Sequence, residues 1–364
     1  MKYFNPVKIV KTKNWLSRLK LHLEDMKISN PIIVTTGGNN KRLGLDLKFN
    51  SKSVYTKFSS NPTIDDCIKI INFCRKNKFD AVVSIGGGSA MDIAKVVMAH
   101  LSSGLENIYD LLSPNLDCKT NVPSIFLPTT HGTASEVTMW GTIWDMENKK
   151  KYSISNVSLY PDIAILDGSL TLTLPLEISI STTLDALSHA FESIWNKNSN
   201  DISSNYAIEA ISCIINNSIK LKKTPLDVDL RTKLLEGSTL AGLAFSNTKT
   251  AASHSISYPL TINYNIPHGI AASITLLPLL DINRDFIKKE LDIILDQNKV
   301  TYQQLKDIIF DIPKGIVPFN LKEWGVRYSD INKLVSESFT KGRMDNNIVD
   351  LDIGNVENIL KSIL

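Results

Sequence analysis

The chain has few cysteines, no long apolar run and almost no net charge. Its four cysteines show neither a Cys-x-x-Cys pair nor regular spacing, which argues against a disulfide framework or a thiolate metal site. No apolar segment reaches the roughly 18 to 20 residues of a membrane span, and the first residues are too polar for a secretory signal. A net charge of +3 with scattered basic residues disfavours nucleic acid. We therefore expect a cytoplasmic protein with neither a membrane nor a nucleic-acid partner.

The length and the order of apolar patterns predict two domains. A chain of 364 residues exceeds the size at which a single core usually stops growing. Its first half alternates helical patterns with short β-branched runs at 31–36, 53–58, 80–88, 123–130 and 161–167, which predicts a parallel sheet covered by helices. Beyond about residue 168 helical patterns dominate. We expect an α/β nucleotide-binding domain over 1–168 and an all-helical domain over 169–364.

A glycine-rich turn joins one predicted strand to a helix. Gly86, Gly87, Gly88 and Ser89 follow DAVVSI and precede AMDIAKVVMAH. Glycines there let the backbone approach a pyrophosphate, and the helix N-terminus offers unpaired N–H groups. Ser89 with Asp92 three residues later is also typical of a helix capping box. A second polar loop, PTTHGTASE at 128–136, suits either a helix cap or contacts with adenosine, and the residues alone leave both open.

Four carboxylate and imidazole groups in the second half predict a metal site. Asp185 and His189 are four residues apart in LDALSHAFESIW, and hence on one helix face. His254 and His268 lie in apolar helical context, where burial without a partner is costly and shared coordination removes the cost. One carboxylate and three imidazoles suit iron(II) or zinc, with manganese also accepted by such a set.

Together, GGGSAMDIAK, PTTHGTASEVT, DALSHAFE and the pairing of His254 with PHG resemble the iron-containing, metal-dependent group III alcohol dehydrogenases. The resemblance implies a dehydroquinate-synthase-like fold, with an α/β dinucleotide-binding domain and an all-α metal-binding domain. It also implies that a metal bound by Asp185, His189, His254 and His268 acts as a Lewis acid on a carbonyl during hydride transfer from NADPH or NADH. Members of the family are commonly dimers, so a homodimer is an open expectation.

The resemblance assigns the cofactor residues and shows two departures. It matches Gly87, Gly88 and Ser89 to the pyrophosphate loop, Thr129, Thr130 and Thr133 to the threonine loop, and Lys151 to a lysine near the nicotinamide ribose; Asp92 is grouped with these cofactor residues. Thr36 and Gly37 replace the aspartate of many NAD-preferring members, so a 2′-phosphate bound by Asn39, Lys41 or Arg42 is tolerable. Tyr258 replaces a proton-relay histidine.

Lys249 stands where most of the family has small or apolar residues. If 247–258 is helical, its ammonium lies near His254 and can hold an anionic group whose carbonyl is on the metal. The surrounding sequence resembles the phosphonoacetaldehyde reductases, which implies a small anionic aldehyde substrate and a place in phosphonate biosynthesis. Further pocket candidates are Asn247, Thr248, His131, Trp195, Asn196 and Lys197. The simpler interpretation is a lysine that extends into solvent.

Three alternatives stay open at this point. Another dehydrogenase of the same family would reduce a small uncharged aldehyde as well as an anionic one. A lyase resembling dehydroquinate synthase would use NAD only transiently, and net formation of NAD(P)+ would exclude it. A non-enzymatic metal-binding protein would leave the glycine loop, the threonine loop and Lys249 without a purpose.

Overall fold

The computed structural model describes residues 2–148 and 150–364, which divide into two compact units. One unit comprises residues 5–130 and 134–171, and the other comprises residues 2–4, 131–133 and 172–364. The change thus lies at 171/172, three residues beyond the predicted boundary, and the short stretch 131–133 groups with the helical part.

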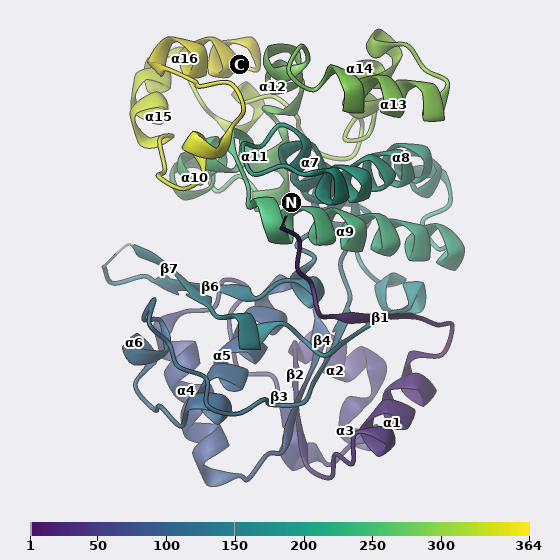
Figure 1. Cartoon of the computed structure of the whole chain (residues 1–364), viewed down its shortest axis with the longest axis vertical. Coiled ribbons are helices and arrows are strands. Elements are labelled where there is room, and N and C mark those ends of the chain that lie inside the picture. Colours follow the sequence, from purple (N-terminus) through teal and green to yellow (C-terminus); the bar gives the residue numbers. More distant parts are fainter. Residues whose placement is uncertain (1, 149) are drawn as a thin grey trace. The chain divides into compact units, whose positions relative to one another are not determined.

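The first unit is built on a six-stranded parallel sheet with the order β1-β8-β5-β4-β2-β3 (Figure 1). Its strands and helices are β1 (Lys8–Lys11), α1 (Trp15–Asp25), β2 (Pro31–Thr35), α2 (Gly37–Leu43), α3 (Leu45–Lys48), β3 (Val54–Tyr55), α4 (Ile64–Lys76), β4 (Ala81–Gly86), α5 (Gly88–Ser103), α6 (Ile108–Leu111), β5 (Ser124–Pro128), β6 (Trp140–Asp145), β7 (Lys150–Ser155) and β8 (Ile163–Leu166). This confirms the predicted parallel α/β fold.

Alternation along the strands creates two cores, one on each face of the sheet. Val82 and Phe126 point into the core under α4 and α5, whereas Val83 and Ile125 point into the core under α1. Central strand β4 is buried at every position, which explains its continuous apolar run. The predicted strand at 53–58 is wrong for most of its length, since β3 holds two residues. The edge strand β1 and the antiparallel hairpin β6–β7 were not predicted, because their polar residues hide the strand pattern.

The second unit is helical. Its helices are α7 (Leu176–Ile194), α8 (Asp201–Lys223), α9 (Val228–Thr248), α10 (Ala252–Tyr264), α11 (His268–Ser273), α12 (Leu276–Asn283), α13 (Lys288–Asn298), α14 (Tyr302–Asp311), α15 (Ile331–Glu337) and α16 (Ile353–Ser362). Helices α7, α8 and α9 pack against one another around one large core. Almost every residue of α7 after Glu177 is buried, so this helix runs through the interior and carries its polar side chains with it.

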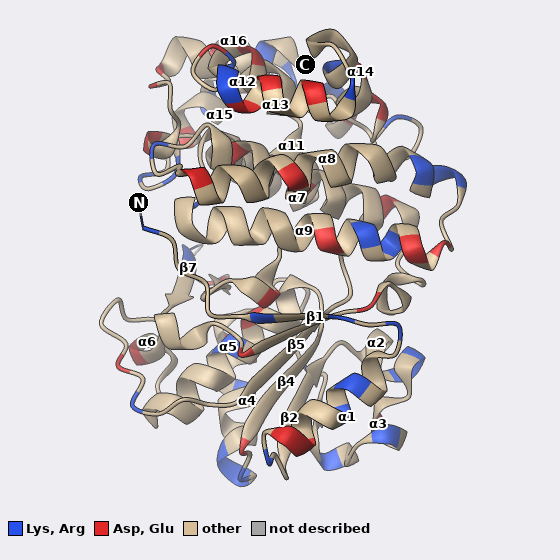
Figure 2. Cartoon of the chain, turned by 45° about the vertical axis from the view of Figure 1, so that its right-hand side comes forward, with Lys and Arg blue, Asp and Glu red and all other residues tan. Residues whose placement is uncertain are grey.

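The expected helix over 247–258 is wrong. Helix α9 ends at Thr248, and α10 begins only at Ala252. Lys249 interrupts the helix because its backbone has φ 65° and ψ 179°, a conformation that costs a residue with a Cβ atom about 1–3 kcal/mol. Figure 2 shows acidic and basic residues interspersed on the helices of this unit.

Candidate active site

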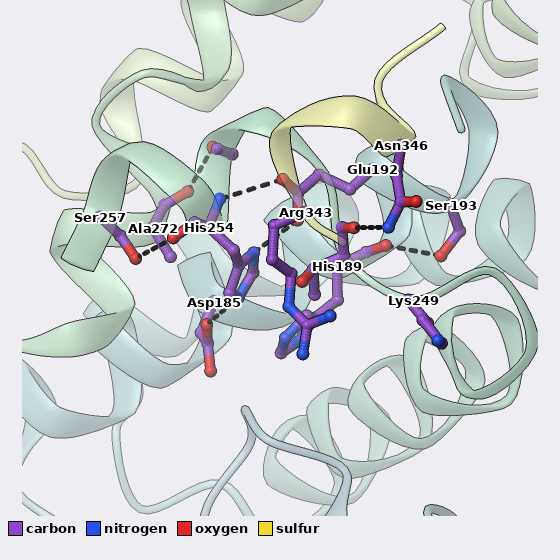
Figure 3. Close-up of polar contacts among 12 residues, drawn as sticks. Asp185, His189, Glu192, Ser193, Lys249, His254, Ser257, Ala272, Arg343 and Asn346 are labelled. Carbon is purple, nitrogen blue, oxygen red and sulfur yellow. Dashed lines mark hydrogen bonds and ion pairs between the residues drawn. The ribbon is translucent and has the colours of Figure 1, made fainter. Parts of the chain in front are cut away.

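A buried carboxylate and two buried imidazoles converge inside the helical unit (Figure 3). Asp185 and His189 project from one face of α7, and His254 comes from α10. One potential ligand atom from each lies within 4.8 Å of the others. The His254 Nε2 atom is 3.4 Å from Asp185 Oδ1, and the rings of His189 and His254 stack at 4.4 Å. The structure therefore brings together three of the four predicted metal ligands in a space suited to one cation.

His268, the fourth predicted ligand, lies at the open side of this cluster. Its Nε2 atom is 3.9 Å from Asp185 Oδ1, and its ring centroid is 5.4 Å from that of His254. Its side chain is 43% exposed, whereas those of Asp185 and His254 are buried. As the first residue of α11, it is positioned by the approach of that helix to α7.

Gly269 sets how closely α11 approaches α7. A Cβ atom at this position would lie 2.1 Å from the backbone oxygen of Ser181, one turn before Asp185. Backbone atoms cannot move aside as a flexible side chain can, so only glycine permits this contact. The PHG motif thus reflects packing as well as ligation, because the glycine places His268 beside the Asp185 carboxylate.

Glu192 completes the site, although the sequence reasoning missed it. Its carboxylate is fully buried; Oε1 accepts a hydrogen bond of 3.0 Å from the His254 backbone N–H, and Oε2 binds His254 Nδ1. A carboxylate behind a ligating histidine fixes the ring orientation and its tautomer. The signal was present, since Asp185, His189 and Glu192 have the i, i+4, i+7 spacing of one helix face.

The donor set fits a divalent transition metal. Within the described residues, Asp185 Oδ1, His189 Nδ1 and His254 Nε2 are buried and have no hydrogen-bond partner, a costly arrangement unless a further group binds there. Burial lowers the pKa of His189 to about 4, with Asp185 opposing the shift, so this imidazole is neutral at pH 7. Burial also opposes the charge of Asp185, but the surrounding histidines outweigh it and hold its pKa below the usual range. Neutral imidazole and ionised carboxylate are the ligating forms.

Several predicted substrate residues have other roles in the structure. Trp195 is fully buried and packs against Phe191 at 5.3 Å between ring centroids, so it belongs to the core. His131 is also fully buried, and burial followed by the nearby Arg231 lowers its pKa to about 3. Asn247 binds the N-terminal segment, because its amide exchanges hydrogen bonds with the backbone of Phe4. All three residues thus have a structural role, and their place in a substrate pocket stays a prediction.

Asn196 and Thr248 act on the backbone of Lys249. Asn196 Nδ2 donates to the Lys249 carbonyl at 3.2 Å, and Thr248 Oγ1 donates to the same oxygen at 3.0 Å. Both side chains are buried, while Lys249 itself is exposed. In Figure 3 the Lys249 side chain lies to the right of the cluster, and its ammonium points away from Asp185. Lys197 does not join it, because its ammonium pairs with Asp350 at 2.5 Å.

Tyr258 lies one helical turn after His254 on α10 and is half-buried. It is followed by Pro259, which is accommodated within the helix. The position is compatible with the predicted role in proton transfer, which stays a prediction.

In the sheet unit, the predicted cofactor residues gather where strands β2, β4 and β5 end. Parallel pairing aligns Thr35 with Ile85 and Gly86 with Pro128, so the loops that follow leave the sheet at one edge. The backbone N–H of Thr129 donates to Gly86 at 3.0 Å, and Asn39 Nδ2 lies 3.4 Å from Thr129 Oγ1. Ligands of open α/β sheets bind at this edge.

The N-cap residue of α5 is Gly87, so no side chain caps this end of the helix. The expected capping box of Ser89 and Asp92 is wrong, since Ser89 Oγ donates to the Ser60 carbonyl instead. Asp92 faces β6, where its Oδ1 atom would lie 3.2 Å from a Cβ atom added to Gly141. A Cβ atom on Gly87 would lie 2.9 Å from Thr130 Cγ2, so the loop is closed against Thr130. The first N–H groups of a helix have no partner within it, so the start of α5 is a candidate phosphate site.

The remaining cofactor candidates are more dispersed. Thr36 caps α2, which begins at Gly37, by accepting a hydrogen bond from Asn39 N–H. The Arg42 guanidinium binds Asn39 Oδ1 and the Leu170 carbonyl, both at 2.9 Å. Lys151 is on β7 with its ammonium 5.5 Å from the Trp144 ring centroid, and Thr133 belongs to the helical unit.

Family models match both units of the chain. The model described as iron-containing alcohol dehydrogenase matches residues 6–168, and the C-terminal model of the Fe-containing alcohol dehydrogenase family matches residues 179–364. The chain belongs to the iron-containing alcohol dehydrogenase family. This result confirms the resemblance at the level of the family and establishes the protein as an oxidoreductase.

Individual relatives agree with the family. Long-chain-alcohol dehydrogenase 1 of Geobacillus thermodenitrificans is 30% identical over 306 residues, covering 81% of this chain and 77% of its own. The NADPH-dependent butanol dehydrogenase of Clostridium saccharobutylicum is 26% identical, covering 92% and 89%. The crystal structure of sulfoacetaldehyde reductase from Bifidobacterium kashiwanohense in complex with NAD+ is 28% identical, with a TM-score of 0.89 over 100% of this chain and 98% of that one. In the described residues, no helix is long and apolar enough to cross a membrane.

Proposed function

We propose that this iron-type dehydrogenase reduces phosphonoacetaldehyde to 2-hydroxyethylphosphonate with NADPH or NADH, in phosphonate biosynthesis. The observation that carries the proposal is Lys249, a lysine five residues before His254 whose backbone has a conformation that glycine alone adopts without strain. Strain of this kind is retained where a residue serves a function. An ammonium next to the carbonyl site gives a negatively charged substrate its second point of attachment.

Different residues would bind the two ends of the substrate. Asp185, His189, His254 and His268 would hold the metal, which when bound supplies Lewis-acid polarisation of the carbonyl. Glu192 keeps His254 oriented for that task. Lys249 binds the anionic group, while Tyr258 is the candidate to deliver the proton that the product alcohol requires.

The cofactor assignment follows the glycine and threonine loops. Gly87, Gly88 and Ser89 would hold the pyrophosphate at the start of α5, with Thr129 and Thr130 beside them. The absence of an acid at Thr36 and Gly37 makes NADPH acceptable, although Arg42 already binds Asn39 and Leu170. Lys151 and Thr133 complete the proposed cofactor contacts.

A matched pair of substrates tests the proposal. The oxidation of NADPH and of NADH by the iron(II)-loaded protein is followed with phosphonoacetaldehyde and with propionaldehyde, for the wild type and for Lys249→Gln. We expect a strong preference for the phosphonate that falls about 10- to 100-fold in kcat/KM in the variant, as for loss of a charged hydrogen bond. Equal turnover of both aldehydes, unchanged by the substitution, would instead indicate a dehydrogenase of small uncharged aldehydes.

A further inference from the structure

A second cation, Arg343, lies in a part of the chain for which no role was predicted. Arg343 is carried by the segment Thr340–Asn347, near the C-terminus. In Figure 3 its side chain extends down from this segment across His189 in the view, and its guanidinium and the Lys249 ammonium both point toward the lower part of the picture.

Hydrogen bonds hold this segment against the metal-binding helices. The backbone N–H of Thr340 donates to Ser255 Oγ at 3.0 Å, and Ser255 follows the ligand His254. At the other end, the Lys197 N–H donates to the Asn346 carbonyl at 2.8 Å, just after helix α7. Met344 is buried in the core of the unit. Arg343 is thus on a fixed support and not on a free tail.

One amide joins the two cationic positions. Asn346 Nδ2 donates to the carbonyl of Thr250, which follows Lys249, and to that of Gly342, which precedes Arg343, both at 2.9 Å. Because both carbonyls bind one nitrogen, the backbones that carry the lysine and the arginine are held next to each other at the edge of the metal site.

Neither cation is neutralised by the described part of the protein. The Arg343 guanidinium donates to the Gly342 carbonyl at 2.8 Å, and neither Arg343 nor Lys249 forms an ion pair among residues 2–148 and 150–364. The two carboxylates of the site, Asp185 and Glu192, both contact His254. Arg343 and Lys249 are left without a carboxylate partner among the described residues.

We infer that Arg343 and Lys249 form one anion-binding pair that selects a doubly charged phosphonate over a singly charged sulfonate and over an uncharged group. A phosphonate dianion offers three acceptor oxygens and a charge that matches the pair, and arginine can bind two of those oxygens at once. The inference rests on the proposed function and adds a residue and a charge selectivity to it.

Three primary alcohols that differ in the group attached to C2 test the pair in the metal-loaded protein with bound NADP+. Binding of 2-hydroxyethylphosphonate, 2-hydroxyethanesulfonate and 1-propanol is measured by calorimetry, and kcat/KM is measured for the corresponding aldehydes. We expect Arg343→Gln to weaken the phosphonate about 10- to 100-fold, the sulfonate by less, and 1-propanol less than about twofold. Arg343→Lys keeps the charge but not the paired contacts, so it should recover part of the loss.

Lys341→Gln is the matched control, because Lys341 is exposed two residues away on the same segment. Equal, small effects of Arg343→Gln and Lys341→Gln on an enzyme that prefers the phosphonate would overturn the inference and leave the proposed function intact. Equal losses for all three compounds in Arg343→Gln would show a structural role and overturn it as well. A wild type without preference for the phosphonate would overturn the proposed function, and this inference with it.

Discussion

The two units build their candidate sites from different parts of the chain. In the sheet unit, the proposed nucleotide site consists of backbone groups at the ends of β2, β4 and β5, including Gly87, which has no side chain. In the helical unit, side chains from α7, α10 and α11 form a cluster that would hold a cation. A site made of backbone depends on loop closure, whereas a site made of side chains depends on how closely helices pack. The two sites should therefore fail separately.

The largest effect is expected from glycines that permit close contacts. Gly269→Ala forces α11 away from Ser181 and takes His268 with it, so we expect loss of tight metal binding, with a destabilisation of several kcal/mol typical of overpacking against fixed backbone. Gly87→Ala meets only the Thr130 side chain and should weaken NAD(P)H binding while leaving metal content unchanged.

Metal content by atomic absorption and cofactor affinity by fluorescence check this separation. Gly38→Ala is the control, since a Cβ atom there meets nothing within 4 Å. Loss of both metal and cofactor binding in either variant would show that the two sites depend on each other.

Glu192 tests whether metal binding depends on the carboxylate that holds His254 in place. Glu192→Gln removes the charge that orients His254, and we expect metal affinity to fall about 10- to 100-fold, as for other such partners of ligating histidines. Competition with a chelator of known affinity measures the change. Glu177→Gln, exposed in the first turn of the same helix, should leave the affinity as it is. Unchanged metal affinity in Glu192→Gln would show that the Glu192 carboxylate only packs against His254 and does not support metal binding.

The smallest expected effect is a gain in stability, which is unusual for a single substitution. Lys249→Gly removes backbone strain, so we expect the free energy of unfolding to rise by about 1 kcal/mol, less than the full strain because glycine also gains freedom in the unfolded chain. The same variant should lose its preference for anionic aldehydes. Lys299→Gly is the comparison, at φ 54° and ψ 44° in the milder left-handed region, and thermal unfolding reports both. A destabilised Lys249→Gly would contradict the view that strain is retained there for function.

The sheet unit and the clustering of Asp185, His189 and His254 could be predicted from the sequence for identifiable reasons. The buried strand β4 and the helix turn after it gave a continuous apolar run followed by glycines, and the i, i+4 spacing of Asp185 and His189 marked a helix face. Each of these signals is local. The edge strand β1 was not predicted because its charged residues mask the strand pattern. The break between α9 and α10 at Lys249 was not predicted because a lysine does not indicate a positive φ.

Long-range packing explains the rest. Arg343 reaches the site only because Asn346 and Thr340 hold its segment against α10 and the chain around Thr250, which no local pattern reveals. The full burial of Trp195 and His131 also depends on this packing, and their predicted place in the pocket stays a prediction. Glu192 could have been found, since it continues the spacing of the two ligands on α7.

A crystal of the protein grown with zinc and 2-hydroxyethylphosphonate, measured at the zinc absorption edge, tests the metal site and the anion-binding pair together. We expect one anomalous peak within about 2.0–2.2 Å of ligand atoms from Asp185, His189, His254 and His268, with the phosphonate in contact with Lys249 and Arg343. A peak held by other residues, or a phosphonate turned away from both cations, would contradict it.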